Sequence, residues 1–132
     1  MRRAAAGLAA LLLLAGVRRG ARGAAPARTR LSRSELATLL QNVGWPATEI
    51  DRATRIALRE SGGDPRAHLV VTDPKPGFGR EDSRGLFQIN VLAWTEYASR
   101  DLYDAATNAR TALEIWRRLG WKPWRLSSQK EQ

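Results

Sequence analysis

The stretch Ala57-Leu58-Arg59-Glu60-Ser61-Gly62-Gly63-Asp64-Pro65 ends a helical pattern with an acidic residue and then forces the chain to turn. Counting back from Glu60, the residues Ala57, Ala53 and Ile50 recur at spacings of three, four and three, which places them on one face of a helix. The opposite face carries three arginines, Arg52, Arg55 and Arg59. Glu60 therefore occupies a position that the periodicity assigns to the buried face.

This placement of Glu60 allows two interpretations. A carboxyl group on an apolar face loses hydration of its charged form, so we expect its pKa to rise. A carboxyl group that stays protonated near neutral pH can serve as a general acid. Alternatively, Glu60 is a partly buried residue at a helix C-terminus that reaches water or hydrogen-bonds to nearby backbone. The periodicity alone does not decide between them.

The composition narrows the class of protein. With 132 residues the chain has room for one domain of modest core, and we expect a monomer. It has no cysteine, and its one histidine, His68, argues against a metal site or a Ser-His-Asp triad, so we expect no metal and no cofactor. The formal net charge is +9, but residues 1–27 hold five arginines and no acid. The remaining, mildly basic chain suits an anionic cell-wall polymer, and we expect no nucleic-acid partner.

Residues 1–27 have the pattern of a targeting segment. A short basic start precedes the apolar run Ala4–Val17, and small residues follow. The run is shorter than the roughly 20 residues that span a membrane. We expect an export signal that contacts the membrane transiently and directs the protein to the periplasm, the cell wall or the medium. Three arginines after the apolar run are unusual for a signal peptide, which leaves an uncleaved anchor or a mis-assigned start codon as alternatives: Arg18, Arg19 and Arg22.

Residues 28–132, with a core at about 34–124, are predicted to form one mainly α domain. Ser32-Arg33-Ser34-Glu35 is a capping box that opens a helix ended by Gly44. A second helix is expected to begin at Thr48 as N-cap and to run to about Glu60. Together these helices form a hairpin that presents Glu60 at its C-terminal end.

Two more helices are expected towards the C-terminus. Val91–Ser99 is predicted to be a short helix. A longer helix follows and ends at Gly120. Its predicted buried positions alternate in steps of four and three: Ala105, Ala109, Ala112, Trp116 and Leu119.

The segment 61–85 does not continue the helical pattern, because glycine and proline interrupt it repeatedly. His68–Thr72 is its only plausible strand, and the segment is interpreted as a loop-rich excursion or a small hairpin. Long loops in compact domains are usually functional, so we expect this excursion to form one wall of a cleft. The predicted fold is therefore mainly α, or α+β: a two-part helical domain with a small loop-rich β insertion that forms a substrate cleft.

Several motifs recur in a familiar order and spacing: Glu60–Ala67, Ser83–Asn90, Leu102–Asp104, Asn108–Ala109 and Gly120–Trp124. Together they resemble the lysozyme-like superfamily, in particular transglycosylase domains of the soluble lytic transglycosylase type and their goose-type lysozyme relatives. The resemblance implies peptidoglycan glycan strands as substrate and Glu60 as the catalytic acid. It implies cleavage of the β-1,4 bond between N-acetylmuramic acid and N-acetylglucosamine.

In the mechanism that the resemblance implies, Glu60 protonates the glycosidic oxygen and then acts as a base. It deprotonates water, which gives hydrolysis, or the C6 hydroxyl of the sugar, which gives a 1,6-anhydro end. Ser83 stands where chicken-type lysozymes carry an Asp, which favours a single-acid lytic transglycosylase. Asp82 and Asp73 are the fallback candidates for a second acid, and either is equally explained as a turn-capping or solvated residue. The alternatives are a hydrolytic muramidase of goose or phage type and a non-catalytic wall-binding or assembly protein on the same fold.

Five further residues are candidates for substrate binding, each with a plainer explanation. Ser83 is expected to orient Glu60 by a hydrogen bond, or to be an ordinary turn serine. Gln88 and Asn90 either face the N-acetyl groups of the sugars or satisfy backbone where the loop rejoins the core. Tyr103 is a candidate for stacking on a sugar ring, or a packing residue. Asn108, one turn into the last helix, is a candidate for a site-facing amide.

Overall fold

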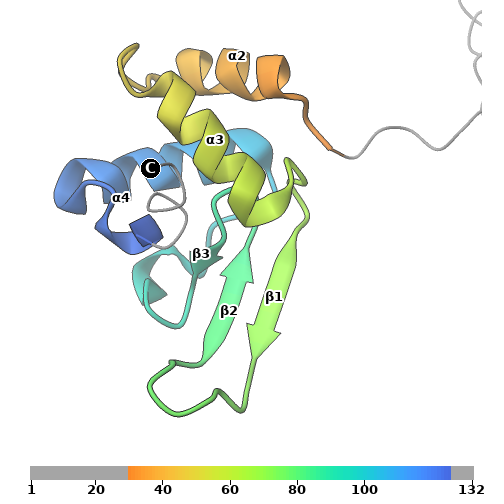
Figure 1. Ribbon diagram of the computed structural model, residues 1–132, viewed down its shortest axis with the longest axis vertical. Helices are drawn as coiled ribbons and strands as arrows, with labels where there is room; N and C mark the ends of the chain where they lie inside the picture. The colour runs from red at the N-terminus through yellow and green to blue at the C-terminus, as the bar shows by residue number, and fades with distance from the viewer. Residues whose placement is uncertain (1–29, 126–132) are drawn as a thin grey trace, which may run out of the picture.

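The computed structural model describes residues 30–125, so the expectations for residues 1–27 and for the polar tail after residue 125 lie outside the described part of the chain. The described chain is mostly helical and includes one small antiparallel sheet, which confirms the predicted fold class (Figure 1). Its elements, in order, are α2 (Arg33–Val43), α3 (Ile50–Ser61), β1 (His68–Val71), β2 (Glu81–Arg84), β3 (Ile89–Asn90), the 3-10 turn η1 (Thr95–Tyr97), α4 (Ala105–Leu119) and the 3-10 turn η2 (Lys122–Trp124).

Helices α2 and α3 form the predicted hairpin. The capping box of α2 is confirmed, because the Ser32 side chain accepts from the Glu35 backbone while the Glu35 side chain accepts from the Ser32 backbone. Gly44 ends the helix in the left-handed conformation, with φ 98°. The expected N-cap of α3 at Thr48 is wrong. A turn closed by Glu49 N–H on Pro46 O carries the chain past Thr48, and Glu49 takes the N-cap position with no side-chain hydrogen bond.

The sheet has the order β1-β2-β3, with both pairs antiparallel. The expected strand after Glu60 is confirmed as β1, but the expectation of a single strand in this region is wrong. Strand β2 has the sequence Glu81-Asp82-Ser83-Arg84, which is entirely polar and shows no apolar alternation. Its Ser83 pairs with Leu69 of β1 and with Asn90 of β3. The hairpin of β1 and β2 extends from the C-terminal end of α3, away from α2 (Figure 1).

The segment predicted as the helix Val91–Ser99 contains only the 3-10 turn η1. The Asn90 carbonyl accepts hydrogen bonds from both Ala93 and Trp94, so the chain forms a tight turn there. Only Val91 and Tyr97 of this segment are buried, and Leu92 is 53% exposed. Two buried positions six residues apart do not make a continuous helical face, so packing gives no reason for a helix.

Helix α4 begins after Asp104, whose side chain accepts from the Thr107 backbone, and it ends at Gly120 as expected. Of its predicted buried positions, Ala109 and Ala112 are buried, and Ala105 and Trp116 are partly buried against the core. Leu119 is 42% exposed, whereas the polar residues Asn108 and Thr111 are fully buried. The face that packs inward is Asn108, Ala109, Thr111, Ala112, Leu113 and Ile115.

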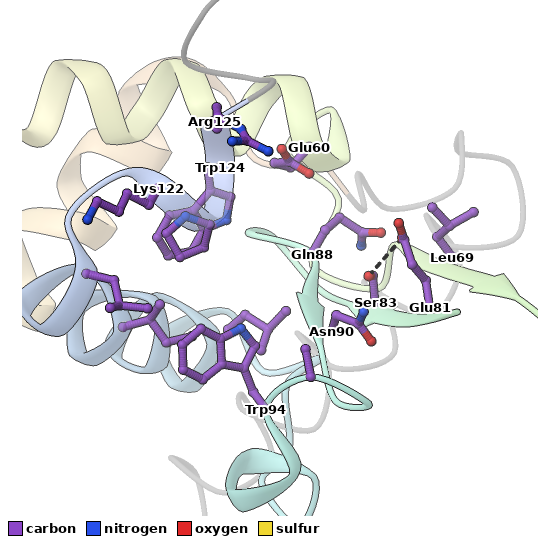
Figure 2. Close-up of a pocket in the computed structure, with 15 residues that line it drawn as sticks. Glu60, Leu69, Glu81, Ser83, Gln88, Asn90, Trp94, Lys122, Trp124 and Arg125 are labelled. Atoms are coloured by element: carbon purple, nitrogen blue, oxygen red, sulfur yellow. Dashed lines mark hydrogen bonds between the residues drawn. The ribbon is translucent and has the colours of Figure 1, made fainter. Parts of the chain in front are cut away.

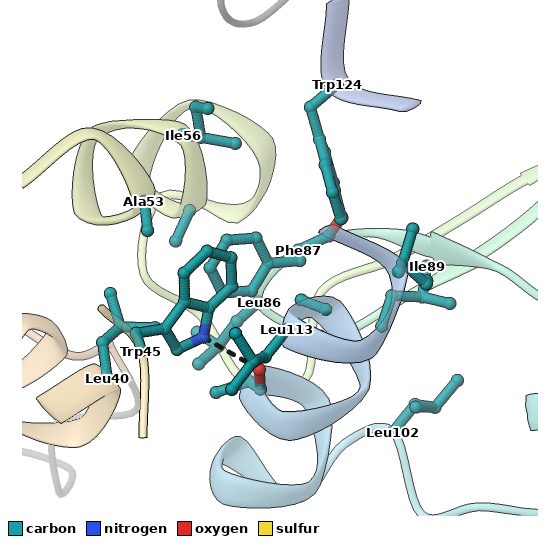
Figure 3. Close-up of a cluster of buried hydrophobic side chains, with 14 of the residues drawn as sticks. Leu40, Trp45, Ala53, Ile56, Leu86, Phe87, Ile89, Leu102, Leu113 and Trp124 are labelled. Atoms are coloured by element: carbon teal, nitrogen blue, oxygen red, sulfur yellow. Dashed lines mark hydrogen bonds between the residues drawn. The ribbon is translucent and has the colours of Figure 1, made fainter. Parts of the chain in front are cut away.

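Trp45 lies in the middle of an aromatic core that joins distant parts of the chain (Figure 3). Its ring stacks on Phe87 with 5.7 Å between centroids, and on Trp121 with 5.5 Å. Its Nε1 donates to the Ala109 carbonyl of α4 at 3.0 Å. Trp124 donates in turn to the Phe87 carbonyl at 2.9 Å. Each buried indole N–H has a partner, so the loop at Phe87 and the turn η2 are fixed against the helices.

Candidate active site

A cleft of about 660 Å³ lies between the helical body and the sheet (Figure 2). The end of α3 contributes Glu60, and strand β2 contributes Glu81 and Ser83. The loop before β3 adds Gln88, and the turn η2 adds Trp124 on the other side. The excursion after Glu60 therefore supplies a wall of the cleft, as the sequence predicts.

Glu60 is placed by the glycines that follow it. Gly62 ends α3 in the left-handed conformation, with φ 64°. Gly63 has φ 80°, and a Cβ there would lie only 2.4 Å from the Leu31 carbonyl oxygen. The Leu31 N–H donates to the Gly63 carbonyl at 2.8 Å, so the turn is tied to the start of the domain. The helix therefore stops one residue after Glu60, whose half-buried side chain reaches the cleft.

Strand β2 brings a second carboxylate, Glu81, into the cleft, which the sequence analysis missed. Residues 81 and 83 lie on one face of the strand because side chains alternate along it. The buried Ser83 donates its hydroxyl proton to Glu81 Oε2 at 3.2 Å. The proton of the Ser83 hydroxyl is thereby used, whereas its oxygen keeps acceptor capacity, so a hydrogen bond that orients Glu60 stays a prediction. If residues 81–84 had been predicted as a strand, its alternation would have placed Glu81 on the same face as Ser83.

The two acids proposed from the sequence as fallback partners do not line this cleft. Asp82 lies on the opposite face of β2, where it accepts from Arg84 at 2.7 and 3.0 Å and contacts His68 Nε2 at 2.7 Å. The hydrogen bond from Arg84, and to a smaller extent that from His68, lowers the pKa of Asp82 to about 2, although its partial burial acts in the opposite direction. Asp73 is exposed in the loop between β1 and β2.

Gln88 and Asn90 both line the cleft, and both are also bonded to backbone. Gln88 Nε2 donates to the carbonyls of Ala67 and Gly85, each at 3.0 Å. Both amide protons are thereby used, so the side-chain oxygen is the group that Gln88 can offer to a ligand. Gln88 has φ 47°, the one positive φ at a non-glycine among the described residues. Such strained conformations cost about 1 kcal/mol or more and cluster at functional sites.

Asn90 bridges the strand to its neighbours. Its Oδ1 accepts from the backbone of Asp82 and of Leu92, and its Nδ2 donates to the Arg80 carbonyl. The interpretation that it satisfies backbone where the loop rejoins the core fits these contacts.

Asn108 and Tyr103 are not among the residues that line the cleft. Asn108 is fully buried; its Oδ1 accepts from Phe87 N–H, and its Nδ2 donates to the Arg84 and Leu102 carbonyls. The predicted site-facing amide is therefore wrong, because all its polar atoms serve the backbone. The ring of Tyr103 packs edge to face on that of His68, with 5.8 Å between centroids. Tyr103 lines a separate pocket.

The wall opposite the sheet is aromatic and basic. Trp94 and Trp124 line the cleft. Lys122 and Arg125 also line it, and Figure 2 shows the Arg125 side chain pointing towards Glu60. Sequence reasoning placed neither basic residue in the site, because the contact depends on how η2 folds back over the core. Across residues 30–125, no three His, Asp or Glu side chains gather as a metal site would need.

A helical body, a small antiparallel sheet and a cleft with an acidic helix end between them define the lysozyme-like α+β fold. Comparison with family models matches residues 37–126 to the Lysozyme like domain family, and the chain belongs to that family. A comparison with curated protein sequences gave no match. The domains of this family are glycosidases in the general sense and act on the peptidoglycan of the cell wall. None of the helices within residues 30–125 is long and apolar enough to cross a membrane.

Proposed function

We propose that this protein is an exported enzyme that cleaves the β-1,4 bond between N-acetylmuramic acid and N-acetylglucosamine in peptidoglycan, with Glu60 as its general acid. The observation that supports this most is the position of Glu60, half-buried at the end of α3 and lining a cleft of about 660 Å³. Membership of the Lysozyme like domain family supports the substrate class.

The chemistry follows from what Glu60 can exchange with the substrate. Its carboxyl proton passes to the glycosidic oxygen, and the bond from that oxygen to C1 of the muramic acid breaks. The electron pair stays with the leaving sugar, and positive charge develops at C1 and the ring oxygen. Glu60, now a carboxylate, can accept a proton from the group that attacks C1. Water gives a hydrolytic end, and the C6 hydroxyl of the same sugar gives a 1,6-anhydro end.

Replacement of Glu60 by Gln tests this role, because the amide keeps the shape of the side chain and has no acidic proton. We expect the full-length Glu60→Gln protein to clear a peptidoglycan suspension at least about a hundredfold more slowly than wild type, the usual scale of acid–base catalysis. Glu96→Gln, which changes an exposed acid of η1 outside the cleft, is the matched control and should keep the wild-type rate. Wild-type protein that binds peptidoglycan without cleaving it would instead support a wall-binding protein.

Action on the wall requires export, and we propose that residues 1–27 direct it. N-terminal sequencing of the protein recovered outside the cytoplasm should then begin after this segment. An intact start at Met1 would contradict cleavage.

A further inference from the structure

Glu81 is a second carboxylate in the cleft. The reaction proposed for Glu60 gives it no role. It lies on the face of β2 that lines the cleft, and its side chain is half-buried. Figure 2 shows its carboxyl group turned towards Ser83, with the Gln88 amide drawn between it and Glu60. The two acids come from different elements, α3 and β2, and so approach the cleft from different directions.

The strand separates Glu81 from its acidic neighbour. Asp82, on the other face, is held by Arg84 and His68, which leaves it no access to a substrate in the cleft. Glu81 instead receives one hydrogen bond, from the buried Ser83 at 3.2 Å. A carboxylate has about four lone-pair positions, so this bond orients Glu81 and leaves acceptor capacity for another group. A carboxylate that is oriented in this way and can still accept a hydrogen bond is suited to take a proton from a water molecule.

We propose that Glu81 is a second catalytic carboxylate, which takes a proton from the attacking water and makes the reaction hydrolytic. This inference rests on the proposed function of Glu60. As Glu60 gives its proton to the glycosidic oxygen, the C1–oxygen bond breaks and its electron pair stays with the leaving sugar. The water oxygen bonds to C1, and one water proton passes to Glu81. Glu81 then releases that proton to solvent and Glu60 regains one, so water is the only reactant consumed.

A base that works on water must stand apart from the acid, because a water molecule has to fit between the base and C1. Gln88 lines the same cleft, and its side-chain oxygen can accept the second hydrogen of the same water, because its amide protons are used by the Ala67 and Gly85 carbonyls. Ser83, by fixing Glu81, is a positioning residue in this scheme.

The test compares full-length wild type, Glu81→Gln and Glu60→Gln on purified peptidoglycan. Mass spectrometry distinguishes the released ends, because a 1,6-anhydro end is one water lighter than a hydrolytic end. We expect Glu81→Gln to release hydrolytic ends about a hundredfold more slowly. The fraction of 1,6-anhydro ends should rise, since the C6 hydroxyl then competes better with water. The acidic limb of the kcat/KM pH profile, which reports the essential base of the free enzyme, should disappear.

Two further variants make the test independent of folding. Asp73→Asn removes an exposed acid from the same hairpin and should keep the wild-type rate and product ratio. Glu81→Asp withdraws the carboxylate by one methylene, so it should lower the share of hydrolytic ends while keeping the acidic limb. Thermal unfolding identifies which of the Glu81 variants are folded.

The outcomes separate this inference from the proposed function. If the folded Glu81 variants keep the wild-type product ratio and pH profile, Glu81 is not the base. If wild type releases only 1,6-anhydro ends and Glu60→Gln is inactive, the role of Glu81 is overturned while that of Glu60 stands. If wild type cleaves no glycan bond, both are overturned.

Discussion

The alternation of side chains along β2 gives adjacent acids different environments. Glu81 and Ser83 face the cleft, whereas Asp82 faces the other way, towards Arg84 and His68. A shift of register by one residue would exchange these faces and put Asp82 in the cleft. The Asp82 contacts hold the outer face of the hairpin, so they also keep Glu81 on the inner one.

Asp82 should make the stability of the domain depend on pH. Its pKa in the folded protein is lowered from 3.8 to about 2, so protonation favours the unfolded chain. The stability that Asp82 contributes is then fully present above about pH 4 and is lost as the pH falls towards 2. We expect Asp82→Asn to be less stable than wild type at pH 7 and to lose less stability between pH 5 and pH 2.

Urea unfolding at a series of pH values measures this difference. Asp73→Asn is the control, because Asp73 is exposed on the same hairpin and makes none of the Asp82 contacts. If the free energies of unfolding of wild type and Asp82→Asn changed in parallel with pH, the contacts of Asp82 would contribute nothing to the pH dependence.

At the scale of single residues, Glu60 could be predicted from the sequence, whereas Glu81 could not. The spacing of Ile50, Ala53 and Ala57 indicates the face on which Glu60 lies, and the glycines mark the turn after it. Glu81 could not be found in the same way, because Glu81-Asp82-Ser83-Arg84 has no apolar residue to set the phase of a strand. Its orientation comes from pairing with β1 and β3, which the residues of β2 by themselves do not reveal. Whether Glu60 has a raised pKa remains a prediction.

At the scale of elements, Asn108 joins α4 to the loop before β3. One buried amide satisfies Phe87 N–H and the carbonyls of Arg84 and Leu102. Gly85 lies against it, with φ 75°, and a Cβ there would come within 2.2 Å of Asn108 Nδ2. The helix thereby fixes the loop that carries Gln88 into the cleft.

Loss of this amide should be costly. Asn108→Ala leaves three buried backbone groups without their partner, at a penalty of about 1 kcal/mol or more each. We expect the free energy of unfolding to fall by about 3 kcal/mol, measured by urea denaturation. Asn42→Ala, at an exposed position of α2, should change it by less than about 0.5 kcal/mol. Equal effects of the two substitutions would contradict the linking role of Asn108.

The elements were predicted best where a local signal sets their ends. The capping box at Ser32, the left-handed Gly44 and the stop at Gly120 are each decided by a few neighbouring residues. The helix expected at Val91–Ser99 was wrong because only Val91 and Tyr97 of the segment are buried, which makes no continuous buried face. The buried face of α4 was predicted only in part, because two of its inward positions, Asn108 and Thr111, are polar.

At the scale of the whole molecule, the cleft is built from segments that are far apart in the chain. Glu60 lies at the end of α3, Glu81 lies in the hairpin, and Lys122 and Arg125 come from the C-terminal turn. The aromatic core at Trp45 sets their relative positions, because it contacts both Phe87 and Trp121. Sequence motifs could predict that a cleft exists, but not its basic wall, since that depends on tertiary packing.

The cleft thus combines acids from α3 and β2 with aromatic and basic groups, which suits a glycan strand that carries anionic peptide substituents. The central claim is that Glu60 cleaves this strand at the muramic acid. Other wall-degrading activities, such as cleavage of the peptide, would also clear a suspension. The position of the new chain end is therefore the more direct observation.

The measurement is mass spectrometry of the fragments that the full-length protein releases from purified peptidoglycan. We expect N-acetylmuramic acid at every new end, as a reducing or a 1,6-anhydro sugar, and no such ends from Glu60→Gln. New ends on N-acetylglucosamine, or peptides released from an intact glycan, would contradict it.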